Sequence, residues 1–252
     1  MLLAALLSLF YKDGATLNLF LAGMSVLVFG AISMLCTKNH TKEMNKREGY
    51  LVVAFGWIVM TVSGTLPYVF TGAIPDFTNA IFETISGYTT TGSTILNDIE
   101  SLPKGVLFWR SLTHWIGGMG IIVLAIAILP LLGIGGMQLF AAEAPGPSAD
   151  KLHPRITDTA KRLWLIYFGY TAAETLCLSL AGMSFFDALN HSMSTLSTGG
   201  FSTKNVSIAH WNDTPVVQYI IILFMFLAGT NFVLSYFAFK GNVSKVVRDE
   251  EF

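Results

Sequence analysis

The stretch that decides the fold is YTTTGSTIL, residues 88–96. It holds four threonines, a serine and a glycine, although the chain around it is 53% hydrophobic and only 12% charged. A typical soluble domain carries about 25% charged residues. The chain therefore has too little charge to cover a globular surface, and we predict a membrane protein. Its net charge of −1 argues against nucleic acid as a partner.

Apolar runs on both sides of this stretch have the length of membrane spans. A bilayer helix needs about 20 mostly apolar residues. Non-helical backbone at membrane depth is tolerated only where protein buries it or where it lines a water-filled cavity. The first ten residues or so, before Lys12, are too few for a full span, and we expect them to be the remaining end of a truncated helix. The five predicted spans are Leu17–Cys36, Tyr50–Phe70, Val106–Gly133, Leu163–Met183 and Val216–Phe239.

Two further apolar stretches are too short to cross a bilayer. Phe77–Thr91 and Phe185–Thr198 each begin beside an acidic residue and end in hydroxyls and glycine. Segments of this length are typical of re-entrant helices, which enter and leave the membrane on one side. A span, a short half-helix, a polar loop and another span together predict a pore loop.

The basic residues predict the orientation of these elements. Eleven of the fifteen lysines and arginines fall in three linkers, which the positive-inside rule places in the cytoplasm. Both half-helices then enter from outside. The three linkers carry Lys38, Lys42, Lys46 and Arg47, then Lys151, Arg155, Lys161 and Arg162, and finally Lys240, Lys245 and Arg248.

The two short stretches are copies of one pattern. When Phe77 is placed on Phe185, Ala80 falls on Ala188, Ser86 on Ser194, Thr90 on Thr198 and Gly92 on Gly200. Both copies have the same orientation, so they are parallel repeats. We predict an all-α membrane protein with N-terminal helices and a basic linker at 1–49, repeats at 50–136 and 156–252, and a cytoplasmic linker at 137–155.

The polar loops have a chemical use in a pore. A cation that leaves water needs other oxygens, which pores supply as rings of backbone carbonyls. Glycine reaches the backbone angles that such loops require, and threonine hydroxyls add oxygens or bond the backbone locally. The C-terminal end of a half-helix also favours a cation. The competing interpretation is that TTTG and STGG are only turns joining helix ends; two such runs at matching positions favour the pore.

The chain resembles the membrane subunit of bacterial Trk-type potassium uptake systems (TrkH-like), within the Trk/Ktr/HKT superfamily. The resemblance covers nearly the whole chain, through GYTTTGSTIL, LPKGVLFWRSLTHWIGGMGIIVLAIAILPLLGIGGMQLF, AEAPGP, KLHPRITDTAKRLWLIYF, STGGFST and LAGTNFVLSYF. The family folds as four repeats around one pore, usually after two extra helices. This sequence holds two repeats, so the resemblance implies the N-terminal half, which supplies two of four loops and would not conduct alone.

The resemblance also assigns site residues, a substrate and partners. It implies K⁺ as the transported ion, held at Thr90, Thr91, Thr198 and Gly199, with no organic cofactor. The implied partners are the other two repeats (from a continuing chain or a second copy), a cytosolic nucleotide-binding ring (TrkA-like), a second subunit in a homodimer, and the lipid bilayer of the inner membrane. The implied selectivity filter is Thr89, Thr90, Thr91, Gly92, Ser197, Thr198, Gly199 and Gly200.

Several residues outside the loops also carry predictions. Ionisable groups inside a membrane are functional candidates, and we expect Glu83 to pair with Arg110 and Glu174 to bond a neighbouring helix. Glycines crowd the third span, where they would let helices approach closely. Asn231 is expected to bond between helices. Tyr68, Trp109, Trp115 and Trp211 are expected in the aromatic belts at the membrane interfaces.

Other functions fit the sequence less well. An enzyme would need a recognisable motif, and HExxH, GxSxG and an acidic metal cluster are all missing from the sequence. An anion carrier would present half-helix N-termini or arginine to its substrate, whereas the two loops here follow helix C-termini and contain no arginine. A Na⁺/K⁺ or proton-coupled cation symporter of the same fold remains open, because the sequence fixes neither the ion selectivity nor the coupling.

Overall fold

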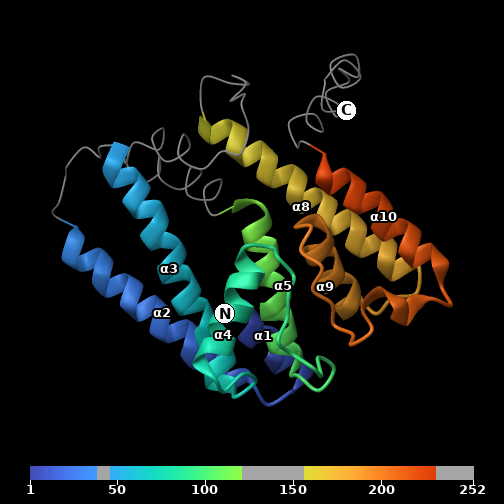
Figure 1. The fold of residues 1–252 in the computed structure, drawn as a ribbon, viewed down its shortest axis with the longest axis horizontal. Coiled ribbons are helices and arrows are strands. Elements are labelled where there is room, and N and C mark those ends of the chain that lie inside the picture. Colours follow the sequence, from blue (N-terminus) through green and yellow to red (C-terminus); the bar gives the residue numbers. More distant parts are fainter. Residues whose placement is uncertain (39–45, 121–155, 231–252) are drawn as a thin grey trace.

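The computed structural model describes residues 1–38, 46–120 and 156–230, and regular structure in these ranges is helical (Figure 1). Three of the described helical stretches are long and apolar enough to cross a membrane: Thr16–Thr37, Ala54–Thr71 and Lys161–Leu180. They match three of the predicted spans. The other two predicted spans, and the linkers that carry most of the basic residues, lie partly or wholly outside the described residues.

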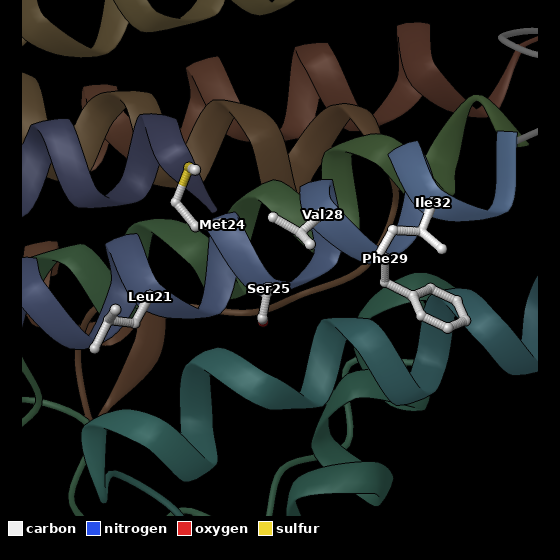
Figure 2. A pocket seen from close by; sticks show the side chains of 6 residues that line it. All are labelled: Leu21, Met24, Ser25, Val28, Phe29 and Ile32. Atoms are coloured by element: carbon white, nitrogen blue, oxygen red, sulfur yellow. The ribbon is translucent and has the colours of Figure 1, made fainter. Parts of the chain in front are cut away.

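The N-terminal part of the fold is a pair of antiparallel helices followed by a long one. Helix α1 (Leu2–Tyr11) packs against the start of α2 (Thr16–Thr37), and α2 in turn packs against α3 (Lys46–Thr71). Ala4 and Leu19 are fully buried where α1 meets α2. Beyond this contact α2 exposes an apolar face (Figure 2), as expected of a helix that faces lipid or another membrane helix.

Both predicted half-helices are present and have the same length. Helix α4 (Phe77–Tyr88) and helix α9 (Phe185–Leu196) each contain 12 residues. Each begins with a side-chain cap: Asp76 accepts a bond from the Asn79 amide, and Ser184 accepts one from the Asp187 amide. Such caps satisfy amides that a helix start leaves free. The same local chemistry therefore starts both helices at matching positions.

Helix α5 (Lys104–Gly118) lies between the two half-helices and packs against both (Figure 1). Two glycines near its end make this possible. A Cβ at Gly117 would clash with the Tyr88 carbonyl at the end of α4, and one at Gly118 would lie 2.6 Å from Ser197 Cβ after α9. The prediction that these glycines allow close helix approach is confirmed.

The predicted second repeat also contains α8 (Ile156–Leu180), a short 3-10 helix η2 (Ser207–Trp211) and α10 (Pro215–Gly229). Helix α9 packs on α8 and α10, and buried Tyr167, Leu196 and Phe224 form one core between them. A second core includes Tyr68 and Trp109 and extends from the N-terminal helices to Phe186 and Met193 of α9.

The prediction that four aromatic residues lie in belts at the membrane interfaces was wrong for Tyr68 and Trp109. Tyr68 is fully buried and Trp109 is 4% exposed, because both lie in the core between α3, α4 and α5. The Trp109 indole donates to the Gly64 carbonyl over 3.0 Å. An aromatic ring near a helix end fits a belt by sequence position, and only its packing shows that it belongs to the core.

Candidate functional site

The two polar loops leave their helices in the same way. After α4, the Thr90 amide bonds the Gly87 carbonyl and the Thr91 amide bonds the Ser86 carbonyl. After α9, the amides of Thr198 and Gly199 make the same two bonds, to Thr195 and Ser194. This pattern is a Schellman motif, whose turning residue has positive φ and is usually glycine.

Here the turning residue is threonine in both loops. Thr90 has φ 54° and Thr198 has φ 55°. A left-handed conformation costs a residue with Cβ about 1–3 kcal/mol, and such strain gathers at functional sites. Two residues later Gly92 and Gly200 also have positive φ, 76° and 90°. Positive φ angles thus occur at the same two positions of both loops, which indicates that the two loops have the same function.

The loops also meet. A Cβ built on Gly92 would clash with the Gly199 carbonyl oxygen and lie 3.0 Å from the Gly199 carbonyl carbon. The first predicted filter loop therefore lies directly against the second. Close backbone approach, together with positive φ, explains glycine at position 92.

The hydroxyls of the loops are engaged mainly in local bonds. Thr89 donates to the Ile85 carbonyl and lies 2.8 Å from the Thr91 hydroxyl, while Ser197 donates to the carbonyls of Met193 and Ser194. Thr198 donates to the Ser197 carbonyl. These bonds fix the shape of the loop, in keeping with the prediction that hydroxyls bond the backbone locally.

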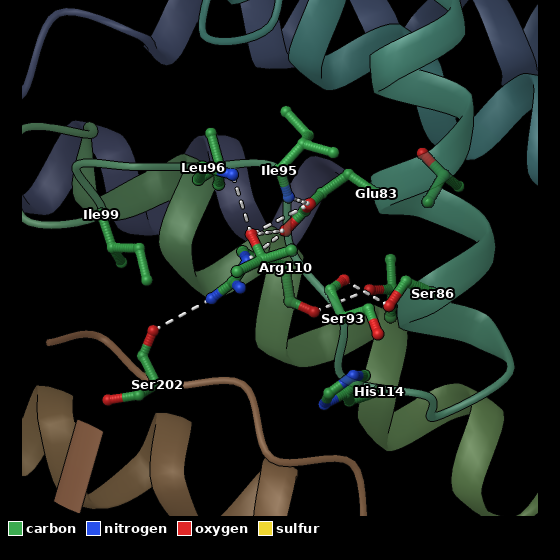
Figure 3. Close-up of polar contacts among 12 residues, drawn as sticks. Glu83, Ser86, Ser93, Ile95, Leu96, Ile99, Arg110, His114 and Ser202 are labelled. Carbon is green, nitrogen blue, oxygen red and sulfur yellow. Dashed lines mark hydrogen bonds and ion pairs between the residues drawn. The ribbon is translucent and has the colours of Figure 1, made fainter. Parts of the chain in front are cut away.

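A buried ion pair supports the first loop. Glu83 is fully buried on α4, and its Oε1 lies 2.7 Å from Arg110 Nε on α5 (Figure 3). The predicted pairing is confirmed. The same carboxylate accepts bonds from the Thr94 hydroxyl and from the Ile95 amide, at 2.9–3.1 Å. Glu83 thereby holds the chain that follows Gly92 against α4.

Arg110 extends this support to the second loop. Its Nη1 donates to the Ser202 carbonyl over 3.0 Å (Figure 3). Its guanidinium carbon lies 3.6 Å from the centre of the Phe201 ring. Arg110 is only 2% exposed. One cation thus joins α4 to the chain just after the second loop, and bonds to both sides offset the cost of burying its charge.

The second half-helix supports its loop with weaker groups. His191, which aligns with Glu83, lies 3.4 Å from the Ser202 hydroxyl, which aligns with Thr94. His114 on α5 stacks on Phe201 at 3.8 Å between ring centres and lies 3.2 Å from the Ser194 hydroxyl. The contact between Glu83 and Thr94 therefore recurs at the aligned positions 191 and 202, with a histidine in place of the glutamate.

The chain beyond the two loops is joined by a cluster that we call the outer clasp: Asp98, Ile99, Glu100, Lys204 and Asn205. Asn205 accepts a bond from the Ile99 amide at 2.6 Å and donates to Asp98 at 3.0 Å, and its own amide bonds Glu100. Lys204 lies 3.6 Å from Glu100. Hydrogen bonds from Asn205 and Ser101 hold the pKa of Asp98 below its usual range.

The structure places the two predicted loops against each other and adds further residues around them. All eight predicted filter residues lie in the two loops that meet at Gly92 and Gly199. Phe201, Ser202 and Asn205 also connect the loops to each other, and they were not among the predicted site residues. The STGGFST pattern offered a signal, because it continues the polar run past the glycines.

These features define a helical membrane protein in which two half-helices carry strained polar loops to one place. The chain belongs to the TrkH family: the family model described as a cation transport protein matches residues 15–251.

Similar proteins support this family assignment. The potassium uptake protein TrkH of Salmonella typhimurium is 45% identical over the whole of this chain, and the uptake protein TrkG of Escherichia coli is 38% identical. The crystal structure of the potassium transporter TrkH from Vibrio parahaemolyticus superposes with a TM-score of 0.78 at 40% identity, covering 95% of this chain and 48% of that one. The match covers 53% of the Salmonella protein, so this chain spans about half the length of its curated relatives.

Proposed function

We propose that this chain takes part in potassium uptake across the cell inner membrane, as two of the four loops that surround a pore. The observation that carries the proposal is the approach of Gly92 to the Gly199 carbonyl, which sets two strained polar loops side by side. Backbone carbonyls in such loops replace the water of a bare cation. The membrane potential then drives uptake with about 2.3 kcal/mol per charge per 100 mV.

The filter in this proposal consists of the residues assigned by the sequence. Thr89 to Gly92 form one wall and Ser197 to Gly200 form the other, with K⁺ bound at Thr90, Thr91, Thr198 and Gly199. The repeats at 50–136 and 156–252 each supply one wall. The shared Schellman turns and helix caps support this division, because they recur at matching positions.

The proposal includes partners that complete the pore and control it. The other two walls come from a continuing chain or a second copy. A TrkA-like nucleotide-binding ring binds the cytosolic side, where the basic linkers are expected, and the transporter is a homodimer. The names of the relatives support the substrate, since they are potassium uptake proteins. They also support a transporter over an enzyme.

Radioactive rubidium, a substitute for K⁺, tests this function. Cells that lack their own potassium uptake are expected to accumulate rubidium when they express the complete transporter that contains this chain. Unlabelled K⁺ should suppress this uptake, and collapse of the membrane potential should stop it.

The outcome of the rubidium assay decides between the candidates. Uptake that ignores the membrane potential or that K⁺ does not suppress would overturn the proposal. Uptake that additionally requires a sodium or proton gradient would identify the symporter alternative.

A further inference from the structure

Glu174 is a buried acid that the proposed filter does not use. It is fully buried on α8, in the stripe with Tyr167, Thr171 and Leu178 that faces the core of the second repeat. Neither of its carboxylate oxygens has a hydrogen-bond partner in the structure. The Thr195 hydroxyl of the neighbouring helix α9 faces Glu174, as expected, but neither oxygen makes a complete hydrogen bond to it.

Among the residues that the structure describes, Glu174 has no ion-pair partner. The titratable side chains of α9 are engaged elsewhere: Asp187 accepts bonds from Ser184 and Thr203, and His191 faces Ser202. Helix α10 contributes apolar residues to the core, and His114 of α5 faces Ser194. The buried face of α8 adds Tyr167 and hydroxyl groups. An ionised carboxylate in such a place would cost several kcal/mol more than a neutral acid.

In the first repeat, the position that corresponds to Glu174 is occupied by Gly64. Helix α3 and helix α8 are both followed by a positive-φ glycine whose amide bonds back to the helix, Gly72 and Gly182. Gly64 precedes Gly72 by the same number of residues as Glu174 precedes Gly182. At Gly64 a Cβ would lie 2.7 Å from the Tyr88 ring and 3.0 Å from its hydroxyl.

The two repeats fill this place in complementary ways. In the first, the Tyr88 ring of the half-helix covers a bare glycine of the span. In the second, Tyr88 is replaced by the shorter Leu196, and the span supplies the long side chain of Glu174. Each repeat thus puts one polar side chain between the span and the last turn of its half-helix, directly before the filter loop.

We propose that Glu174 is a protonated carboxylic acid that positions α9, and through it the second filter loop, by filling this space and sharing a hydrogen bond with Thr195. A neutral acid both donates and accepts, and so does a hydroxyl. Glu174 is a positioning residue, which acts through the Thr198–Gly200 backbone and does not touch the ion. The proposal rests on the proposed function for its transport test only.

Two substitutions in the complete transporter test the role in transport. Glu174→Gln keeps the size and the hydrogen bonding without ionising, so rubidium uptake and its pH profile should equal those of the unmodified protein. Glu174→Ala removes the side chain, and uptake should fall about tenfold or more, since buried cavities destabilise their surroundings. If the Gln variant is as defective as the Ala variant, or if Ala has no effect, the proposal is wrong.

Infrared difference spectroscopy of the purified protein against Glu174→Gln tests the proton directly. We expect one carbonyl band of a protonated carboxylic acid that the Gln variant lacks. A difference that shows only an ionised carboxylate would overturn the proposal. This readout does not depend on transport, so a failure of the proposed function would show separately, as absent rubidium uptake by the unmodified protein.

Discussion

Replacing Gly92 with alanine is expected to abolish rubidium uptake, with a loss of about 100-fold or more. The new Cβ would clash with the Gly199 carbonyl, so the two loops would have to separate. Displacements of about 1 Å are enough to disable a positioned site on that scale. The alanine would also hold φ near 76°, which disfavours any residue with a Cβ.

Gly72→Ala is the matched control for this prediction. Gly72 has φ 71°, nearly that of Gly92, but a Cβ at this position meets nothing within 4 Å. Its alanine variant therefore carries the same backbone penalty without the clash, and uptake should stay within about twofold of the unmodified protein. Equal losses in the two variants would show that strain alone, and not contact between the loops, explains the glycine.

Removing Arg110 is expected to cause the largest loss of stability among single side chains of the site. Arg110→Ala leaves the Glu83 carboxylate buried without its cation and breaks the bond to the Ser202 carbonyl. Breaking one side of a buried ion pair costs about 3–5 kcal/mol. Thermal unfolding of the protein in detergent should show a clear drop in the midpoint, with loss of uptake.

A double variant separates charge from packing in this pair. Adding Glu83→Gln to Arg110→Ala removes the unpaired charge, so part of the lost stability should return. Lys104→Ala, on the same helix but exposed, is the control and should change stability by about 1 kcal/mol or less. An Arg110→Ala variant as stable as the Lys104→Ala variant would contradict the role given to the pair.

Much of this fold could be predicted from the sequence because it depends on periods and local chemistry. Apolar runs of bilayer length predicted the three spans that the described residues contain, and the short runs predicted α4 and α9 within a few residues. The match between Phe77 and Phe185 reflects local rules, such as the caps at Asp76 and Ser184, that act within a few residues of chain.

The contacts between the repeats could not be predicted in the same way. Asn205 and Ile99 are far apart in the sequence, and only the packing of α5 between the half-helices brings their chains together. Glu174 shows the same limit. Its residue type suggested a bond to another helix, but whether a partner is in place depends on side chains of three helices. The pairing of Glu83 with Arg110 was predictable, because one buried charge in a half-helix needs a partner nearby.

The measurement that tests the central claim most directly is an experimental structure of the complete transporter with bound rubidium, located by its anomalous scattering. Rubidium is expected between the carbonyls of residues 90–92 and those of residues 198–200, with Gly92 still against Gly199. Density for the ion at some other place, or two loops that lie apart and face lipid, would contradict the proposal that these strained segments form two walls of one pore.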